Sequence, residues 1–219
     1  STALTDRVSD IINNVRKLGD RAIVKYNHEL DQFKSERFKL SLQEIQAGAA
    51  LISPDLKAAI DLAAKNIKKF HTIESKSIRS VQVSEGLICE ERILPIERVG
   101  IYVPGGTAPL ISSLLMCAIP AQLAGCKNIV VTTPAQKLKS ELPETSIATQ
   151  KDLSQYVHPG LLYICNLLSL TEVYLVGGAQ AIAAMAYGTE SIQASYKIFG
   201  PGNSYVMEAN KQISLAGVA

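Results

Sequence analysis

Tryptophan is absent from this chain, aromatic residues are few, and neither sign of charge predominates. Aromatic residues make up 5% of the 219 positions, and 22 Lys and Arg stand against 20 Asp and Glu, which gives a formal net charge of +2. No long run of one sign occurs along the chain. An electrostatic surface for nucleic acid or for an anionic membrane is therefore not expected, and we predict neither partner.

Cysteine and histidine are also scarce, with four and three residues respectively. The cysteines, at positions 89, 117, 126 and 165, form no CxxC pair and have no histidine at zinc-like spacing. Free thiols in a reducing compartment are the simpler interpretation. We therefore expect no metal site built from these residues.

Long hydrophobic runs are missing as well. No stretch approaches the roughly 20 apolar residues that a transmembrane helix needs. The first residues, Ser-Thr-Ala-Leu-Thr-Asp-Arg, lack the charged and then apolar layout of a signal peptide. These absences favour a cytoplasmic protein, or an organellar one whose leader is already gone. With 47% hydrophobic residues, the chain can bury a large core.

The first 97 residues combine helical patterns with one region of period two. Apolar residues recur at helical spacing on one side of several segments before residue 72, and Ser41-Leu-Gln-Glu44 fits a capping box. Between Ile78 and Leu94, apolar and polar residues alternate around Glu85-Gly86, which predicts a β-hairpin. We expect a helical and hairpin unit over residues 1–97.

From Val99 onwards, short runs rich in Val and Ile end in turns marked by glycine or proline and are followed, directly or after a linker, by helical patterns. The turns are Val99-Gly-Ile-Tyr-Val-Pro-Gly-Gly-Thr-Ala-Pro109, Thr132-Thr-Pro134, Val176-Gly-Gly-Ala-Gln180 and Phe199-Gly-Pro-Gly-Asn203. Repeated strand, turn and helix predict an α/β fold, an open parallel sheet with Rossmann-like βα repeats over residues 98–219. Residues 134–157 are polar and patternless, which predicts an insertion or surface loop.

The predicted topology brings these turns together. Right-handed crossovers place the carboxyl ends of all the strands at one edge of the sheet, where open α/β sheets bind ligands. Glycine lets the backbone approach a ligand, and helix N-termini attract anions, so a nucleotide is one interpretation. The other is that the glycines serve turn geometry alone. The usual G-x-G-x-x-G is missing, and the second strand ends in Thr132-Thr133 where an acidic residue would hold a ribose.

Catalytic side chains are missing from the turns. No Asp, Glu or His lies inside them, and His28, His71 and His158 are elsewhere. Glu190 and Glu208 are near in sequence, but solvated helix residues are the simpler interpretation of both. The residues by themselves predict a site that binds a small molecule, with no catalytic set.

Four motifs together resemble the histidinol dehydrogenase family. They are Val99-Gly-Ile-Tyr-Val-Pro-Gly-Gly-Thr-Ala-Pro109, Ile119-Pro-Ala-Gln-Leu-Ala-Gly-Cys126, Val176-Gly-Gly-Ala-Gln-Ala-Ile-Ala183 and Lys197-Ile-Phe-Gly-Pro-Gly-Asn203. Lys17-Leu-Gly-Asp-Arg-Ala22 and Asn66-Ile-Lys-Lys-Phe-His71 extend the resemblance more weakly to the N-terminal half. Nearly the whole chain is covered, and residues 135–157 depart from the family pattern.

The resemblance implies a zinc-dependent homodimeric enzyme of histidine biosynthesis. Such an enzyme oxidises L-histidinol through the aldehyde to L-histidine in two NAD-linked steps. Carried over by motif, the NAD contacts are Tyr102, Gln180 and Asn203, and residues 98–219 are the NAD-binding domain. A tyrosine offers a ring face and a hydroxyl, and the two amides both donate and accept hydrogen bonds.

The same resemblance places the zinc ligands, a Glu-His acid/base pair and most substrate contacts on sequence beyond Ala219. We therefore expect the N-terminal half of a histidinol dehydrogenase, a truncated form that is inactive alone, with no catalytic or metal residue in this chain. Two alternatives remain open. One is a non-catalytic nucleotide-binding or interaction module derived from that fold, and the other is a fragment that dimerises through surface that an absent half would cover.

Overall fold

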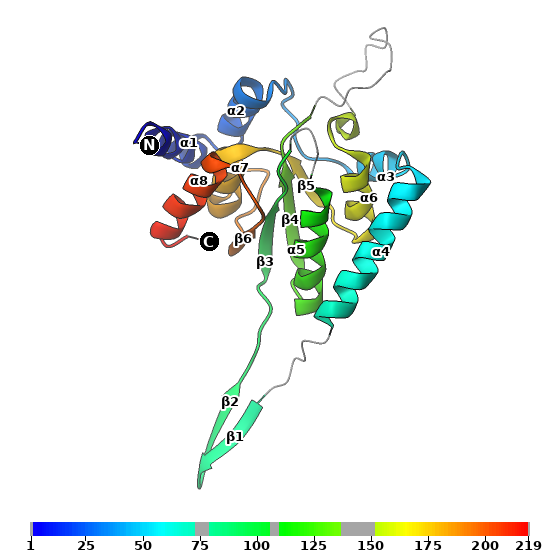
Figure 1. The fold of residues 1–219 in the computed structure, drawn as a ribbon. Coiled ribbons are helices and arrows are strands. Elements are labelled where there is room, and N and C mark those ends of the chain that lie inside the picture. The colour runs from blue at the N-terminus through cyan, green and yellow to red at the C-terminus, as the bar shows by residue number, and fades with distance from the viewer. Residues whose placement is uncertain (1, 73–78, 106–109, 137–151, 219) are drawn as a thin grey trace.

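The computed structural model describes residues 2–72, 79–105, 110–136 and 152–218 (Figure 1). The α-helices of these residues are, in chain order, α1 (Thr2–Leu18), α2 (Asp20–Asp31), α3 (Leu42–Ala49), α4 (Pro54–His71), α5 (Ile111–Ala124), α6 (Pro159–Leu167), α7 (Gly178–Tyr187) and α8 (Ser204–Leu215). None of these helices is long and apolar enough to cross a membrane. The helices predicted before residue 72 are confirmed.

A four-stranded parallel sheet forms the centre of the molecule. Its strands are β3 (Arg98–Tyr102), β4 (Asn128–Thr133), β5 (Glu172–Leu175) and β6 (Lys197–Phe199), in the order β5-β4-β3-β6. All three neighbouring pairs are parallel. The prediction of an open parallel sheet with βα repeats is confirmed.

The strand order reverses direction next to β3. The chain moves from β3 to β4 and then to β5, and it returns through α7 to add β6 on the other side of β3. In open α/β sheets, ligands bind at such a reversal, outside the carboxyl ends of the strands. The topology therefore points to the ends of β3 and β6, where the first and fourth glycine turns lie.

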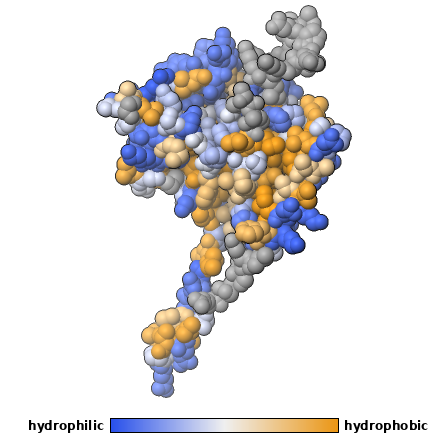
Figure 2. Space-filling model, in the orientation of Figure 1, coloured by the Kyte–Doolittle hydropathy of each residue, from blue (hydrophilic) through white to orange (hydrophobic). Residues whose placement is uncertain are grey.

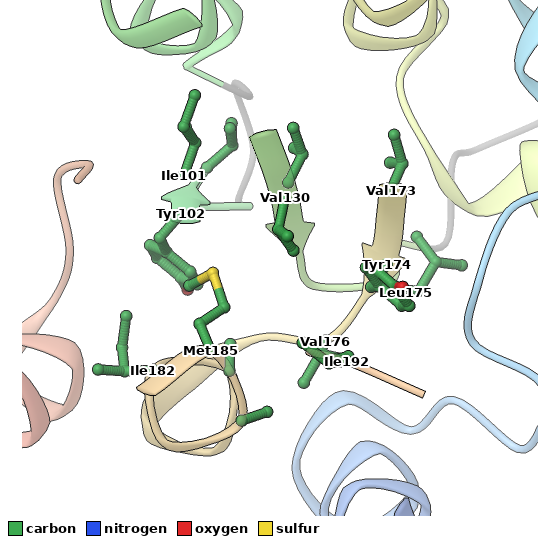
Figure 3. Close-up of a cluster of buried hydrophobic side chains, with 14 of the residues drawn as sticks. Ile101, Tyr102, Val130, Val173, Tyr174, Leu175, Val176, Ile182, Met185 and Ile192 are labelled. Atoms are coloured by element: carbon green, nitrogen blue, oxygen red, sulfur yellow. The ribbon is translucent and has the colours of Figure 1, made fainter. Parts of the chain in front are cut away.

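Helices cover both faces of the sheet (Figure 1). On one side α5 and α6 pack together, with α4 and α3 packed outside them, and on the other side α7 packs with α1, α2 and α8. In Figure 3, Ile182 and Met185 of α7 lie beneath the strand that carries Tyr102. Ile101, Val130 and Val173 are fully buried in the sheet, as side chains are when helices cover both faces.

The N-terminal helices are thus shared between the two faces of the sheet. The buried faces of α1 and α2 belong to the same hydrophobic core as the strands, and so do those of α3 and α4. On α1 that face consists of Val8, Ile11, Ile12 and Val15, at helical spacing. The division into residues 1–97 and 98–219 stays a prediction.

The predicted β-hairpin projects from the body of the molecule (Figure 1). Strands β1 (Arg79–Ser84) and β2 (Leu87–Glu91) pair antiparallel, and Gly86 takes the positive φ of 78° that the tight turn requires. Every residue of β2 is exposed, including Leu87 at 54% and Ile88 at 63%. The described hairpin therefore contributes nothing to the core.

Both ends of residues 134–157 have defined structure, which the sequence does not predict. In particular, the prediction that 152–157 is a loop without pattern is wrong. Leu153–Tyr156 forms a short 3-10 helix, capped by Asp152, in which Leu153 is fully buried. The N–H of Gln136 donates to the carbonyl of Tyr156, so the two ends of the excursion are paired. The polar composition does not predict this short helix, because contacts with residues distant in the sequence hold it in place. The residues between, 137–151, lie outside the described part.

Candidate functional site

Three of the glycine-marked turns touch one another at the carboxyl edge of the sheet. A Cβ atom added to Gly105, after β3, would lie 2.6 Å from the side chains of both Pro134 and Gln136, which follow β4. A Cβ atom on Gly177, after β5, would lie 2.6 Å from Pro134. Real Cβ contacts are never this short, so larger residues would push these turns apart. The predicted convergence of these turns is confirmed.

The fourth turn lies against the first. Gly200, after β6, has a φ of 130°, and a Cβ atom there would collide with the carbonyl oxygen of Tyr102. Both the dihedral and the space admit only glycine. The Gly200 turn therefore lies directly against the end of β3, at the point where the strand order reverses.

Tyr102, the first predicted cofactor contact, is the last residue of β3 and is only 3% exposed. Its hydroxyl accepts a hydrogen bond of 3.2 Å from the N–H of Gly178, the first residue of α7. Burial raises the pKa of this phenol, an effect opposed by the Gly178 N–H and reinforced by the charge of Asp31. Tyr102 is therefore a neutral phenol that links β3 to the start of α7.

Gln180, the second predicted contact, lies in the first turn of α7 and is 1% exposed. Neither its Oε1 nor its Nε2 has a hydrogen-bond partner among the described residues. A buried amide without partners destabilises a folded protein, and such groups are rare. Gln180 lies at the start of the helix that follows the Gly177 turn, so this amide lies beside the converging turns.

Asn203, the third predicted contact, follows the β6 turn and caps α8. Its Oδ1 accepts the N–H groups of Tyr205 and Val206, at 3.0 and 3.1 Å. The residue is exposed, and its amide nitrogen makes no hydrogen bond to the described part of the chain. Capping therefore uses the oxygen of this side chain, and the NH₂ group stays available as a donor.

Asp31 is a polar residue of this edge that the sequence did not reveal. It is the last residue of α2, and its Oδ2 lies 3.2 Å from the Cβ position of Gly177. This oxygen is buried and has no partner among the described residues. Burial raises the pKa of the carboxyl group from 3.8 to about 6. One turn earlier, Nδ2 of Asn27 donates to the carbonyl of Leu175, at the end of β5, at 2.8 Å.

The sequence gives little sign of Asp31, because this residue lies far from the glycine turns along the chain. The one local signal is that Asn27 and Asp31 stand four residues apart in a helix and thus share a face. Asn27 is 1% exposed, so that face is buried. The sequence does not tell which part of the sheet the face meets.

The other candidate carboxylates make structural contacts. Glu190 accepts the N–H of Asp20 at 2.7 Å, and Glu208 accepts a hydrogen bond from Gln212 at 2.9 Å. His158 caps α6 through Nδ1, which accepts the N–H of Gly160 at 3.1 Å. Glu208 lies in α8, as the simpler interpretation predicts. Glu190 is exposed but follows the end of α7, so the prediction that it is a helix residue is wrong.

No three His, Cys, Asp or Glu side chains of the described residues are grouped so that they could hold a metal ion. The cysteines at positions 89, 117, 126 and 165 are free thiols. The zinc site that the sequence resemblance implies therefore finds no ligand set in the residues that the structure describes.

An apolar cavity of about 590 Å³ lies away from these polar groups, on the α5 side of β3. Its lining includes Leu94, Met116, Cys117 and Phe199. Figure 2 shows hydrophobic surface gathered on the face of the molecule that this view presents. Apolar surface of this kind marks contact with other protein or with an apolar ligand.

The fold and the edge described above define the class of protein. It is an α/β protein with an open parallel sheet that reverses its strand order beside β3, and glycine turns and an unpartnered buried amide meet at its carboxyl edge. Proteins of this class bind small-molecule ligands at that edge.

Comparison with known proteins narrows the class to a family. The sequence model of histidinol dehydrogenase matches residues 1–219. The chain is 42% identical over 217 residues to histidinol dehydrogenase of Bacteroides thetaiotaomicron, covering 99% of this chain and 47% of that protein. It is 40% identical over 211 residues to the enzyme of Vibrio vulnificus, covering 96% and 44%. The chain belongs to the histidinol dehydrogenase family, which comprises oxidoreductases of histidine biosynthesis.

The fold agrees with this assignment. The crystal structure of histidinol dehydrogenase from Elizabethkingia anophelis superposes with a TM-score of 0.87 at 40% identity, covering 99% of this chain and 46% of that one. The family recognised from the motifs is therefore confirmed. The chain spans about half the length of the relatives that it matches.

Proposed function

We propose that this chain forms the NAD-binding part of a histidinol dehydrogenase, an enzyme that oxidises L-histidinol to L-histidine in two NAD-linked steps. The observation that carries the proposal is the side chain of Gln180. Its amide is 1% exposed and lacks partners for both polar atoms, and it lies at the edge where open α/β sheets bind ligands. A dinucleotide, rich in donors and acceptors, can satisfy both atoms.

The three predicted contacts fit this role in different ways. Gln180 would hydrogen-bond the cofactor with both amide atoms, and Asn203 would donate from the nitrogen that capping leaves free. Tyr102 would act chiefly by position, because its hydroxyl already holds the N–H that begins α7. Bound NAD would supply the hydride acceptor of the reaction.

The described residues do not fit zinc, because they offer no group of ligands for it. We therefore propose that the described residues bind the cofactor without carrying out the oxidation. By itself the chain would not turn over L-histidinol. As the family resemblance implies, we also propose a cytoplasmic homodimer, for which the apolar lining of the α5-side cavity offers contact surface.

A non-catalytic nucleotide-binding module is the second candidate function. It needs no metal, and the described residues contain no group of three or more His, Cys, Asp or Glu that could hold one. Both candidates bind nucleotide, and they differ in whether further protein turns the bound nucleotide into a reacting cofactor.

The test is calorimetric titration of the purified chain with NAD⁺, using Gln180→Leu as the site variant. Gln43→Leu, which changes an exposed glutamine of α3, is the matched control. We expect wild type and Gln43→Leu to bind NAD⁺ alike and Gln180→Leu to bind at least tenfold more weakly. The proposal is wrong if the folded wild-type chain gives neither heat nor a thermal shift at millimolar NAD⁺.

A second assay tests the proposal that the chain is inactive by itself. Wild-type chain is mixed with L-histidinol and NAD⁺, with and without added zinc, and NADH absorbance is followed. No turnover is expected from the chain alone. Turnover would contradict the proposal that the chain is inactive by itself and would exclude the non-catalytic module.

A further inference from the structure

Four buried polar atoms without partners gather around the β5–α7 turn. Among the described residues they are Oδ1 of Asn27, Oδ2 of Asp31 and both amide atoms of Gln180. Two come from α2 and two from α7, helices far apart in the sequence that pack against each other. Gln180 alone could be a packing defect, but several such atoms from two helices at one turn indicate a site that needs a ligand.

Asp31 is the charged member of this group. An ionised carboxylate is strongly destabilising when it is buried without a donor or a positive partner. The N–H of Gly178, which begins α7 and could have capped this carboxylate, donates instead to the hydroxyl of Tyr102. The pKa of Asp31 is shifted by burial, and no charged partner contributes to the shift. The described structure therefore gives this carboxylate no structural hydrogen-bond partner.

Asp31 lies where ordinary dinucleotide sites have an acidic residue, at the end of the second strand. In ordinary dinucleotide sites, an Asp or Glu at the end of the second strand holds a ribose hydroxyl pair. Here the second strand, β4, ends in Thr133 and is followed by Pro134. A Cβ atom added to Gly177 would lie 2.6 Å from Cβ of Pro134 and 3.2 Å from Oδ2 of Asp31. Helix α2 thus brings a carboxylate to the point where the second strand ends.

We propose that Asp31 holds a ribose of the bound dinucleotide, its carboxylate accepting hydrogen bonds from the hydroxyl pair and excluding a ribose that carries a phosphate. Asp31 as a whole is only partly buried, so a ligand at the edge can reach its carboxyl group. The assignment rests on the proposed NAD site. It makes Asp31 the residue that discriminates NAD⁺ from NADP⁺, and it makes the site depend on a helix that the sequence assigns to a separate unit.

The test compares Asp31→Asn, which keeps the shape of the side chain, with Glu29→Gln, an exposed residue of the same helix, as the control. Calorimetry measures NAD⁺, NADP⁺, ADP-ribose and nicotinamide mononucleotide against each protein. We expect Asp31→Asn to lose about tenfold in NAD⁺ affinity. The preference for NAD⁺ over NADP⁺ should fall by more than tenfold, because the repelling charge is gone. The extra phosphate of NADP⁺ is on the adenosine ribose, so weaker binding is expected with ADP-ribose and not with the mononucleotide. Weakening confined to the mononucleotide would contradict the role of Asp31 in discriminating NAD⁺ from NADP⁺.

Thermal unfolding of the free proteins tests whether Asp31 has only a structural role. A carboxylate that holds the fold together would leave Asp31→Asn less stable than wild type. A carboxylate kept for a ligand leaves it equally stable or more stable, which is the expected result. If wild type binds NAD⁺ and Asp31→Asn matches Glu29→Gln in affinity and in preference, the assignment of Asp31 is wrong and the NAD site stands. If wild type binds no nucleotide, both proposals fall.

Discussion

Single residues at the carboxyl edge combine low exposure with unmet hydrogen bonds. Gln180 and Asn27 are each 1% exposed, and each has at least one polar atom without a partner among the described residues. Binding sites tolerate such groups because the ligand completes them, and the free protein is less stable as a consequence. Changes at these residues should therefore affect the stability of the free protein.

Replacing Gln180 with leucine should stabilise the free protein while removing the proposed contact with the nucleotide. The variant replaces two unpartnered polar atoms with an apolar side chain of similar size, so we expect a gain of about 1 kcal/mol in the free energy of unfolding. Urea denaturation without ligand measures it, with Gln43→Leu as the control. A clear loss of stability in Gln180→Leu would show that the amide has partners in the free protein.

Asp31 should make stability depend on pH in a window set by its pKa. Its pKa is raised from 3.8 to about 6 in the folded state, so the folded protein binds this proton more tightly than the unfolded chain does. The stabilisation from the protonated carboxyl group of Asp31 is complete below pH 3.8 and is lost as the pH rises through about 6. We expect stability to fall by about 2 kcal/mol across that window relative to Asp31→Asn. Parallel urea titrations of both proteins between pH 3.5 and 7 check it.

At the scale of elements, side-chain caps mark where α3, α4, α6 and α8 begin. In α3 the capping box of Ser41 and Glu44 is present, and Glu44 also pairs with Arg37 at 2.6 Å and accepts the N–H of Leu153 at 2.7 Å. One carboxylate therefore joins the start of α3 to the 3-10 helix at the end of the excursion. Sequence spacing predicts the box, and only the fold brings Leu153 to it.

Glu44 should lose its stabilising effect in acid. Burial raises its pKa, but hydrogen bonds from Arg37, Ser41 and Leu153 outweigh burial and lower the pKa from 4.5 to about 2. A depressed pKa stabilises the fold above pH 4.5, and this stabilisation disappears as the pH falls towards 2. Arg37 is 43% exposed, so solvent screens the pair and the effect is smaller than the pKa shift alone would give. We expect Glu44→Gln to cost about 1 to 2 kcal/mol at pH 7 and nearly nothing at pH 2. Equal destabilisation at both pH values would refute this account.

The β6–α8 turn should not accept a side chain at Gly200. Its φ of 130° is strained for other residues, and a Cβ atom would meet the carbonyl oxygen of Tyr102. We expect Gly200→Ala to destabilise the protein by about 2 kcal/mol or more. Thermal unfolding measures this, with Pro201→Ala in the same turn as the control. Similar stability of the two variants would be incompatible with the described contact.

At the scale of the whole molecule, a single core is combined with a hairpin that stays outside it. The buried side chains of α1 to α4 and of the sheet form one cluster, whereas the hairpin of β1 and β2 stands apart from the body (Figure 1). Exposed Val81, Leu87 and Ile88 make the hairpin an apolar arm that packs against no described helix.

Removing the hairpin should therefore leave the body folded. Residues 80–91 are all exposed, so replacing them by a short Gly-Ser linker deletes no buried side chain. We therefore expect the thermal midpoint to change by less than about 3 °C. Circular dichroism of the two proteins is the measurement. A large drop would mean that the hairpin stabilises the body through contacts that its described exposure does not suggest.

The sequence by itself determined the helices, the hairpin, the four parallel strands and the family, because helical spacing, alternation and glycine turns act over a few residues. It also placed Tyr102, Gln180 and Asn203 at one edge, since parallel strands end together. Only the tertiary structure decided the strand order β5-β4-β3-β6 and the distribution of α1 to α4 over both faces. It alone brought Asp31 against the β5–α7 turn, because packing between helix α2 and helix α7 is a long-range contact that no local pattern records.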